Sequence, residues 1–258
     1  MSQFELLRFE RVGAVAHVQI NRPEKRNALS DPLIAEIKQC MLEMPSDVGA
    51  IVIDGVGDHF SAGLDLSELR ERTTAEGMYH SLSWHDAFHQ VQFGRVPVIS
   101  VLRGAVIGGG LELAASTHIR IAEPSAYYAL PEGQRGLFVG GSGSVRIPRL
   151  IGFARMTDMM LTGRVYDAQE GQDIGLTQYL VDAGKGIEKA MALAERIAQN
   201  APLTNYAVMH VLPRIASQPM AEGLIMESMI AAISSGDPEA KSRLAAFMEK
   251  RAAKVTRD

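Results

Sequence analysis

Three consecutive glycines precede an acidic side chain in the segment GAVIGGGLELAAS, which spans residues 104–116. Glycine lets the backbone turn at positive φ and lets a ligand approach it closely, so a helix beginning within Gly108–Gly110 leaves amide N–H groups exposed at its N-terminus. Such amides suit an anion or an oxyanion that develops during a reaction. We expect Glu112 to lie in the first turn of this helix, next to whatever the amides hold. The alternative is structural: the glycines permit close helix–strand packing, and Glu112 stabilises its own helix N-terminus.

A second glycine-rich segment, YYALPEGQRGLFVGGSGS (residues 127–144), carries another acid, Glu132. It follows a strand-like run and ends where a helix can begin, although a lone acid at such a place is also typical of a surface turn. A third segment, GDHFSAGLDLSEL (residues 57–69), places Ser61, Ala62 and Gly63 ahead of Leu64. This pattern indicates another loop-to-helix entry with free amides.

Alternating strand and helix patterns surround these segments. The runs VAHVQI (15–20), GAIVIDG (49–55), VPVISVL (96–102) and HIRIAE (118–123) are typical of strands. Ser30 can cap a helix that follows the first strand, and SLSWHDAFHQVQF (81–93) has helical spacing. Such alternation favours an α/β fold with parallel strand pairing.

Strand patterns cease from about Gly184 onward. Four successive segments, separated by Pro or Gly, have helical spacing. We therefore predict a catalytic core over residues 1–195 and a C-terminal helical region over residues 196–258 that serves oligomerisation and closure of the site.

Composition excludes several classes of protein. The chain has 258 residues, is 47% hydrophobic and 22% charged, and carries a net charge of −4. These values are those of ordinary soluble globular proteins, and the net charge gives no general attraction to nucleic acid or to an anionic membrane. Cys40 is the only cysteine, so no internal disulfide and no cysteine-based zinc site is expected. The first residues match no targeting segment, and we expect a cytoplasmic protein that does not enter a membrane.

Five ordered motifs give the chain a family resemblance that covers about residues 5 to 250. They are NRPEKRNALS (21–30), FSAGLDL (60–66), GAVIGGGLELA (104–114), LPEGQRG (130–136) and LTGRVYDAQEGQDIGL (161–176). In order and spacing they resemble the enoyl-CoA hydratase, or crotonase, family. The resemblance implies an α/β crotonase-like fold of repeated ββα units with a C-terminal helical region, assembled as a homotrimer or as a hexamer of two trimers.

The resemblance also implies a set of catalytic groups. The backbone amides of Leu64 and Gly109 correspond to the family's oxyanion donors, and Glu112 and Glu132 correspond to its two catalytic glutamates. The implied reaction adds water to a trans-2-enoyl-CoA and gives a 3-hydroxyacyl-CoA. Glu112 would deprotonate the water while Glu132 delivers a proton to the α carbon. Two carboxyls that converge in a partly dry pocket should raise the pKa of one of them.

Contacts to the CoA part of the substrate are expected from several places. The loop residues Arg22, Lys25 and Arg26 suit the phosphates, although each also fits a solvated basic loop. The resemblance places the pantetheine along residues 62–67. The full set of expected substrate contacts is Arg22, Lys25, Arg26, Ala62, Asp65, Leu66, Ser67, Gly140, Phe247 and Lys250. No cofactor is expected beyond the CoA of the substrate itself.

The segment after Glu132 departs from the family pattern. Many relatives have an aliphatic residue and a proline where this chain has GQRGLFVGG, so the acyl pocket is not defined by the resemblance. Arg135 fits either a polar acyl group or a structural salt bridge. Trp84, His85 and His89 raise a further question, because the two histidines have the i,i+4 spacing of a metal-binding helix. No third ligand completes that site, and no metal is expected.

Alternative functions remain within and outside the family. Isomerisation or another acyl-CoA lyase reaction needs only one well-placed glutamate, whereas the presence of both favours hydration. Dehalogenation is disfavoured because no aspartate lies between Gly133 and Val145. The GGSGS run at residues 140–144 lacks the final glycine of a hydrolase nucleophile elbow. A non-catalytic RNA-binding or scaffold role would favour a basic face, which the net charge does not suggest.

Overall fold

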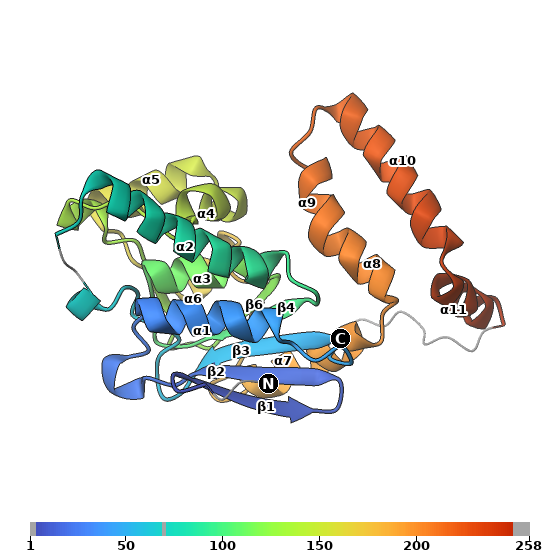
Figure 1. Cartoon of the computed structure of the whole chain (residues 1–258), viewed down its shortest axis with the longest axis horizontal. Helices are drawn as coiled ribbons and strands as arrows, with labels where there is room; N and C mark the ends of the chain where they lie inside the picture. Colours follow the sequence, from blue (N-terminus) through green and yellow to red (C-terminus); the bar gives the residue numbers. More distant parts are fainter. Residues whose placement is uncertain (1–3, 69–70, 250–258) are drawn as a thin grey trace. The chain divides into compact units, whose positions relative to one another are not determined.

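The computed structural model describes residues 4–68 and 71–249 (Figure 1). The chain divides into two compact units, Met1–Ala198 and Gln199–Asp258. The larger unit is an α/β structure, and the smaller one contains only helices among its described residues.

A six-stranded sheet forms the centre of the larger unit. Its spatial order is β1 (Leu7–Val12), β2 (Val15–Ile20), β3 (Ala50–Gly55), β4 (Val98–Leu102), β6 (Ile119–Ala122) and β9 (Tyr179–Leu180). Strand β1 is antiparallel to β2, and all later pairs are parallel, as the alternation of strand and helix patterns predicts. The carboxyl ends of the parallel strands consequently lie at one edge, where ligands of α/β sheets generally bind.

A second, three-stranded sheet carries the segments around the two glutamates. It consists of β5 (Ala105–Ile107), β7 (Tyr127–Ala129) and β8 (Tyr166–Asp167), with β5 and β7 parallel. Because Glu112 follows β5 and Glu132 follows β7, the parallel pairing delivers both acids to the same end of this sheet.

Helices cover both faces of the main sheet. The described part of the larger unit contains α1 (Asp31–Leu42), α2 (Thr74–Gln92), α3 (Gly109–Ser116), α4 (Gly143–Ile151), α5 (Phe153–Thr162), α6 (Ala168–Asp173) and α7 (Gly186–Ala198). Short 3₁₀ turns occur at η1 (Pro23–Lys25), η2 (Leu66–Glu68) and η3 (Gly133–Arg135). After Gly63 the described residues form the 3₁₀ turn η2, and α2 begins at Thr74, where Thr73 and Glu76 form a capping box.

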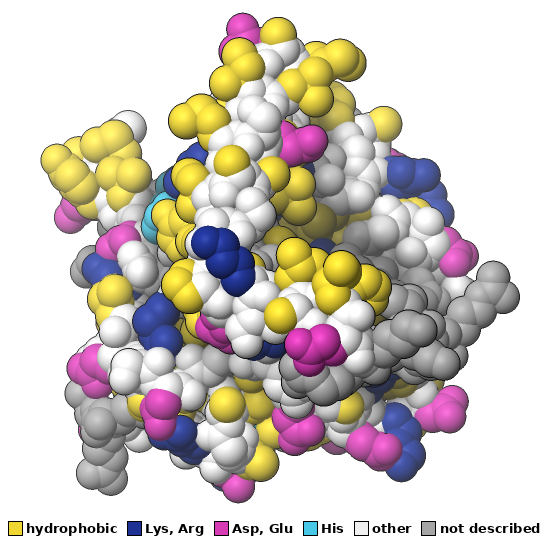
Figure 2. Space-filling model, turned by 90° about the vertical axis from the view of Figure 1, so that its right-hand side faces the viewer, with side chains coloured by type: hydrophobic (Ala, Val, Ile, Leu, Met, Phe, Trp, Pro, Cys, Tyr) yellow, Lys and Arg dark blue, Asp and Glu magenta, His cyan; other side chains and the backbone are white. Residues whose placement is uncertain are grey.

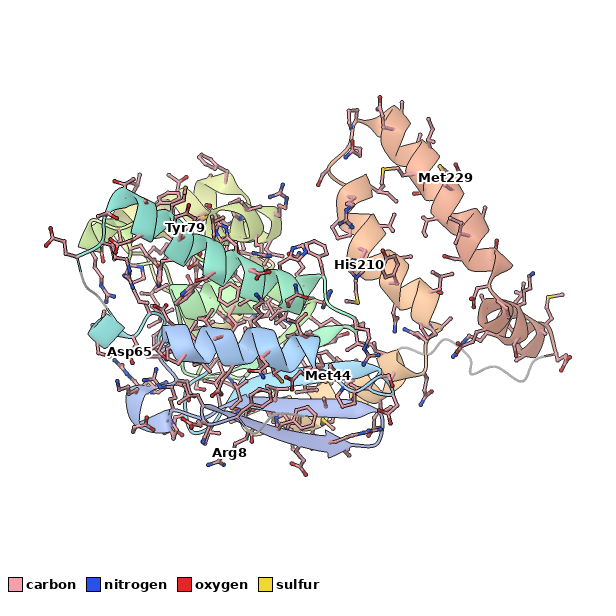
Figure 3. All side chains as sticks on the ribbon, viewed as in Figure 1. Arg8, Met44, Asp65, Tyr79, His210 and Met229 are labelled. Atoms are coloured by element: carbon pink, nitrogen blue, oxygen red, sulfur yellow. The ribbon has the colours of Figure 1, made fainter. Side chains whose placement is uncertain are left out.

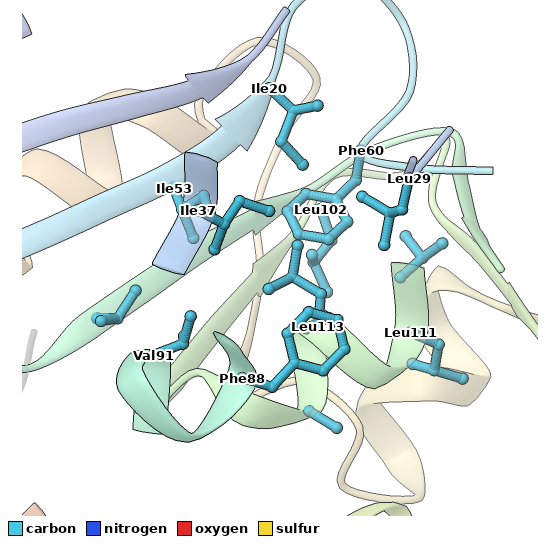
Figure 4. Close-up of a cluster of buried hydrophobic side chains, with 14 of the residues drawn as sticks. Ile20, Leu29, Ile37, Ile53, Phe60, Phe88, Val91, Leu102, Leu111 and Leu113 are labelled. Atoms are coloured by element: carbon cyan, nitrogen blue, oxygen red, sulfur yellow. The ribbon is translucent and has the colours of Figure 1, made fainter. Parts of the chain in front are cut away.

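Two hydrophobic clusters hold these layers together. The larger cluster packs α1, α2 and α3 against one face of the sheet, and Figure 4 shows Phe60, Phe88 and Leu113 within it. The smaller cluster packs Ala190 and Leu193 of α7 against the opposite face. Successive residues of β3 alternate between the two clusters, as side chains on a strand must.

The smaller unit consists of α8 (Pro202–Tyr206), α9 (Leu212–Ile215), α10 (Met220–Gly236), α11 (Pro238–Met248) and the π-helical segment η4 (Ala207–Val211). Residues 202–215, which have the spacing of one helix, are interrupted by η4. The cause lies at Pro213, which has no N–H to continue the hydrogen-bond ladder. Within the described ranges, no helix combines the length and apolar character needed to cross a membrane.

The packing predicts which leucines carry the stability of the fold. Leu113 is fully buried in the larger cluster, whereas Leu42 at the end of α1 is 60% exposed. Replacing Leu113 by Ala should lower the free energy of unfolding by roughly 2–5 kcal/mol, because the change leaves a cavity. The control Leu42→Ala should change it by less than about 1 kcal/mol. Chemical denaturation of both variants measures the difference, and equal effects would contradict the described core.

Candidate active site

A cavity of about 550 Å³ lies where the three glycine-rich segments meet. It is lined by Ala62, Gly63, Leu64, Leu66, Arg72, Gly77, His80, Ser81, Trp84, Ile107, Gly108, Gly109, Glu112, Pro131, Glu132, Arg135, Leu137, Phe138, Gly140 and Gly141. Each of the three glycine-rich segments therefore lines part of the cavity, and α2 lines a further part.

Two isolated β-bridges align the first two segments. Leu29 bridges to Leu64, and Ser61 bridges to Val106. Their approach depends on Gly63, whose φ is +88°: a Cβ on this residue would lie 2.6 Å from the carbonyl oxygen of Ile107. The same Cβ position lies only 3.4 Å from the amide nitrogen of Gly109, so the two segments present their backbones side by side.

The amides of Leu64 and Gly109 both border the cavity. Neither N–H donates a hydrogen bond to any residue in the described part of the chain, although the amides of Leu29 and Asp65 on either side of the bridge do. Gly109 is the first residue of α3, where a helix leaves its N–H groups without an internal partner. These two amides can therefore donate to an atom within the cavity.

Glu112 lies in the first turn of α3, as the glycine pattern predicts, and is only 3% exposed. Its Oε1 accepts hydrogen bonds from the amides of Gly141 (2.9 Å) and Gly143 (2.6 Å). A Cβ on Gly143 would lie 2.7 Å from this Oε1, so glycine is needed for the approach. The carboxyl group thus faces the second glycine-rich segment rather than its own helix N-terminus.

Glu132 approaches the same cavity from the end of β7 and is half-buried. Gly108, with φ +52°, provides the space: a Cβ there would lie 2.5 Å from Oε1 of Glu132. Oε2 of Glu132 is buried and has no hydrogen-bond partner among the described residues. An unpaired carboxyl oxygen of this kind is available to a substrate or a water molecule.

Burial changes the acidity of both carboxyls. It raises the pKa of Glu112 to about 7; the two glycine amides oppose this effect, and the charge of Glu132 adds to it. Burial also raises the pKa of Glu132, against the opposing charge of Arg135. The expectation that one pKa is raised is therefore too narrow, because both carboxyls are desolvated.

The basic loop expected to meet CoA is partly engaged within the protein. Arg22 is buried, and its guanidinium donates to Oδ2 of Asp65 (2.7 Å), which Lys25 also approaches at 3.0 Å. Burial works against the charge of Asp65, but hydrogen bonds from Ser67, Lys25 and Arg22 outweigh it and hold the pKa of this carboxyl well below its usual range. Figure 3 shows Asp65 beside the beginning of α1. This cluster fastens the loop of residues 22–28 to the segment of residues 61–67.

The remaining predicted contacts are distributed unevenly. Ala62, Leu66 and Gly140 line the cavity, and Arg26 is exposed on the neighbouring loop. Phe247 is an exposed residue of α11 in the smaller unit. Lys250 lies outside the described residues.

The wall that α2 supplies could not be assigned from the sequence. Trp84 packs under Gly109, where a Cβ would lie 2.8 Å from the indole ring, and its Nε1 donates to Oδ1 of Asp31. His80 pairs with the same oxygen at 2.8 Å. The helical spacing of residues 80 and 84 is a signal that these residues share a face, but nothing in the sequence connects that face with Gly109.

The histidine pair is not part of this wall. His85 contacts Ser81 at 3.3 Å, and the ring of His89 packs against Phe93. Across the part of the chain that the structure describes, no group of three or more His, Cys, Asp or Glu side chains could hold a metal ion. Arg135 borders the cavity together with the exposed side chains of Leu137 and Phe138.

An α/β fold that directs one buried acid, one half-buried acid and two free backbone amides into one cavity is that of the crotonase-like enzymes. The sequence profile described as enoyl-CoA hydratase/isomerase matches residues 10–257. The chain therefore belongs to the enoyl-CoA hydratase/isomerase family, which confirms the family and the class of enzyme inferred from the five motifs.

Relatives and solved structures agree with this assignment. The short-chain-enoyl-CoA hydratase of Clostridium acetobutylicum is 31% identical over 245 residues, with 94% of each chain covered. A crystal structure from Rhodopseudomonas palustris with a provisional enoyl-CoA hydratase name superposes with a TM-score of 0.93 at 58% identity, covering 97% of both chains. The enoyl-CoA hydratase of Bacillus anthracis gives a TM-score of 0.90 at 28% identity, covering 97% of this chain and 98% of its own. The predicted crotonase-like fold is thus confirmed.

The raised pKa of Glu112 has a consequence for stability. Between the ordinary value of 4.5 and about 7, the folded protein retains a proton that the unfolded chain has lost, so stability falls as pH rises through this interval. Glu112→Gln removes this titration. The change in the free energy of unfolding that the substitution causes should therefore be more stabilising at pH 8 than at pH 5, by up to roughly 3 kcal/mol.

Denaturation of the wild-type and Glu112→Gln proteins at both pH values measures this change. Glu10→Gln, at an exposed position of strand β1, is the control for loss of a glutamate carboxyl outside the cavity. A Glu112→Gln effect of the same size at both pH values would contradict the raised pKa.

Proposed function

We propose that this protein is an enoyl-CoA hydratase that adds water across the double bond of a trans-2-enoyl-CoA and forms a 3-hydroxyacyl-CoA. The proposal rests on one observation: the carboxyl groups of Glu112 and Glu132 and two backbone amides that donate no hydrogen bond to the described residues all border one cavity. The family assignment restricts the reaction class, and the pair of acids favours hydration over reactions that use a single acid.

The two amides would stabilise the charge that the reaction develops. When water attacks the β carbon, the electrons of the double bond move toward the thioester carbonyl, and its oxygen becomes an enolate oxygen. Hydrogen bonds from Leu64 and Gly109 to this oxygen would be stronger in the transition state than in the substrate. Removal of one such donor typically lowers the rate by roughly 10²–10³-fold.

The two glutamates would move the protons. Glu112, in its ionised form, accepts a proton from the attacking water as the oxygen bonds to the β carbon. Glu132, in its protonated form, donates a proton to the α carbon, so that one water is added across the double bond. Return of the proton from Glu112 to Glu132 restores the enzyme. Since burial raises the pKa of both groups, a state with one proton on the pair is accessible near neutral pH.

The nucleotide end of CoA would contact the basic loop next to the cavity. Lys25 and Arg26 are exposed there, whereas the buried Arg22 is committed to Asp65 and holds the loop in place. We propose Ala62, Leu66 and Ser67 as neighbours of the pantetheine. Contacts from Phe247 and Lys250, the cytoplasmic location and the absence of an added cofactor remain predictions.

Substitution of the glutamates tests the mechanism. Glu112→Gln and Glu132→Gln keep the shape of each side chain but cannot exchange the required proton. Each should lower kcat for hydration of crotonyl-CoA by roughly 10²–10⁴-fold. The assay follows loss of the conjugated ultraviolet absorbance and identifies the 3-hydroxyacyl product, with Glu10→Gln as the control.

Two results would contradict this proposal. Near-normal turnover in both variants would exclude the two-carboxylate mechanism. Rearrangement of the double bond with no 3-hydroxyacyl product in the wild-type protein would assign the chain to the isomerases of the same family.

Assembly with further copies of this chain is proposed from the surface of the smaller unit. Helix α10 carries apolar side chains around much of its circumference, and Leu224, Ile225, Met229 and Ile233 are each more than half exposed. Figure 2 shows groups of exposed hydrophobic side chains on the face that it displays. Because α10 contains few charged residues, we propose that another copy covers it in a trimer or a pair of trimers.

Sedimentation equilibrium tests the assembly. We expect a mass three or six times the 28.0 kDa of one chain. Ile225→Asp should shift the distribution toward smaller species, because a charge would be buried at the contact. Glu227→Gln, an exposed polar position of the same helix, is the control. A wild-type protein that sediments as a monomer would refute this proposal.

A further inference from the structure

One residue beside the catalytic cavity has an unfavourable backbone conformation. Ser142, which immediately precedes α4, has φ 84° and ψ 9°, in the left-handed region. Residues with a Cβ rarely adopt this conformation, because the Cβ then lies too close to the backbone carbonyl oxygen. The residue is flanked by Gly141 and Gly143, yet the left-handed position itself is occupied by a serine.

A chain of side-chain contacts holds Ser142 in place. The guanidinium of Arg146, one turn further along α4, donates from Nη1 to Oγ of Ser142. Nε of the same guanidinium donates to Oε1 of Gln92 at 2.7 Å. Gln92 ends α2, and its backbone carbonyl oxygen accepts a hydrogen bond from Nε2 of His118 (2.9 Å). The left-handed turn is therefore connected to two other elements of the larger unit.

The turn directs two amides to one atom. A left-handed residue between two others rotates successive N–H groups to the same side and creates a concave anion-binding arrangement. Here the N–H groups of Gly141 and Gly143, on either side of Ser142, both donate to Oε1 of Glu112. Oε2 of Glu112 accepts no hydrogen bond from the described residues. The two oxygens of this carboxyl are thus chemically distinct.

We infer that Ser142 is a positioning residue for Glu112: its left-handed backbone, held through Arg146 and Gln92, occupies Oε1 and leaves Oε2 to exchange the proton with water. The inference rests on the proposed hydration, because that reaction assigns the proton exchange to Glu112. Ser142 itself does not line the cavity.

The charged groups that face Glu112 set the expected effect of disturbing the turn. Glu132 disfavours the ionised form of Glu112, whereas Arg146 and the two amides favour it. If the amides move away, the pKa of Glu112 rises further. Because the reaction requires ionised Glu112, kcat/KM rises with pH as this carboxyl loses its proton. A higher pKa of Glu112 moves this acidic limb of the profile to higher pH.

Two substitutions at one position separate the backbone effect from loss of the hydroxyl. Ser142→Ala and Ser142→Gly both remove Oγ, but only glycine adopts the left-handed conformation without strain. We expect kcat/KM for crotonyl-CoA at pH 7 to be about 10–100-fold lower in Ser142→Ala than in Ser142→Gly, since small displacements of a catalytic group cost this much. The acidic limb should lie at higher pH in the alanine variant. Equal rates and equal profiles in the two variants would overturn the inference.

Arg146→Met, introduced into the wild-type protein and into the Ser142→Gly variant, tests whether Arg146 acts through Ser142. Loss of the Arg146 charge raises the pKa of Glu112 in every background, so the informative quantity is the difference between backgrounds. We expect a larger loss of kcat/KM when residue 142 is serine than when it is glycine. The same loss in both would show that Arg146 does not act through Ser142.

A control variant and two further measurements distinguish failure of this inference from failure of the proposed function. Ser144→Ala, at an exposed position of α4 with ordinary helical geometry, is the control and should leave the pH profile unchanged. A ¹³C NMR titration of the Glu112 carboxyl reports the effect of each substitution without turnover. If the wild-type protein hydrates no enoyl-CoA, the proposed function fails, while the titration still tests whether Ser142 orients the amides. Thermal unfolding of each variant establishes that it is folded.

Discussion

Desolvation of two carboxyl groups is the constraint around which the rest of the larger unit is arranged. A carboxylate in a low-dielectric cavity is costly unless hydrogen bonds or a change in protonation compensates for it. Glu112 receives two backbone amides and still has its pKa raised to about 7. Both acids need glycines opposite them, because a Cβ on Gly108 or Gly143 would overlap a carboxyl oxygen. The glycine-rich segments are therefore the condition under which acidic groups can be buried next to the main chain.

The sheets and helices convert this local chemistry into a single site. Parallel pairing of β5 with β7 delivers the two acids to one end of the small sheet, and the bridges from Leu29 and Ser61 bring the third segment alongside. Helix α2, from a different part of the chain, supplies Trp84 as the support beneath Gly109. The cavity is thus formed by segments far apart in the sequence, and each contributes either a carboxyl, a backbone donor or a wall.

Local patterns predicted most of this architecture. The strands at residues 15–20 and 50–55, the cap at Ser30 and the helix that begins within Gly108–Gly110 follow from periodicity and backbone preference. The pairing of Arg22 with Asp65 did not follow, because it joins residues 43 positions apart whose polar character equally suits a solvated surface. The role of α2 was also hidden, since a helical stripe does not reveal which loop it covers. The left-handed Ser142 was unpredictable because serine gives no sequence signal for positive φ.

Use of main-chain amides at positions 64 and 109 has an evolutionary consequence. A point mutation can replace the side chain of Leu64, but it leaves the N–H in place for every residue except proline. The N–H of Leu64 is consequently shielded from most genetic change, whereas substitution of Gly109 is restricted, because a Cβ there would lie 2.8 Å from the indole ring of Trp84. At position 64 the hydrogen-bond donor therefore belongs to the backbone and persists when the side chain that borders the cavity changes.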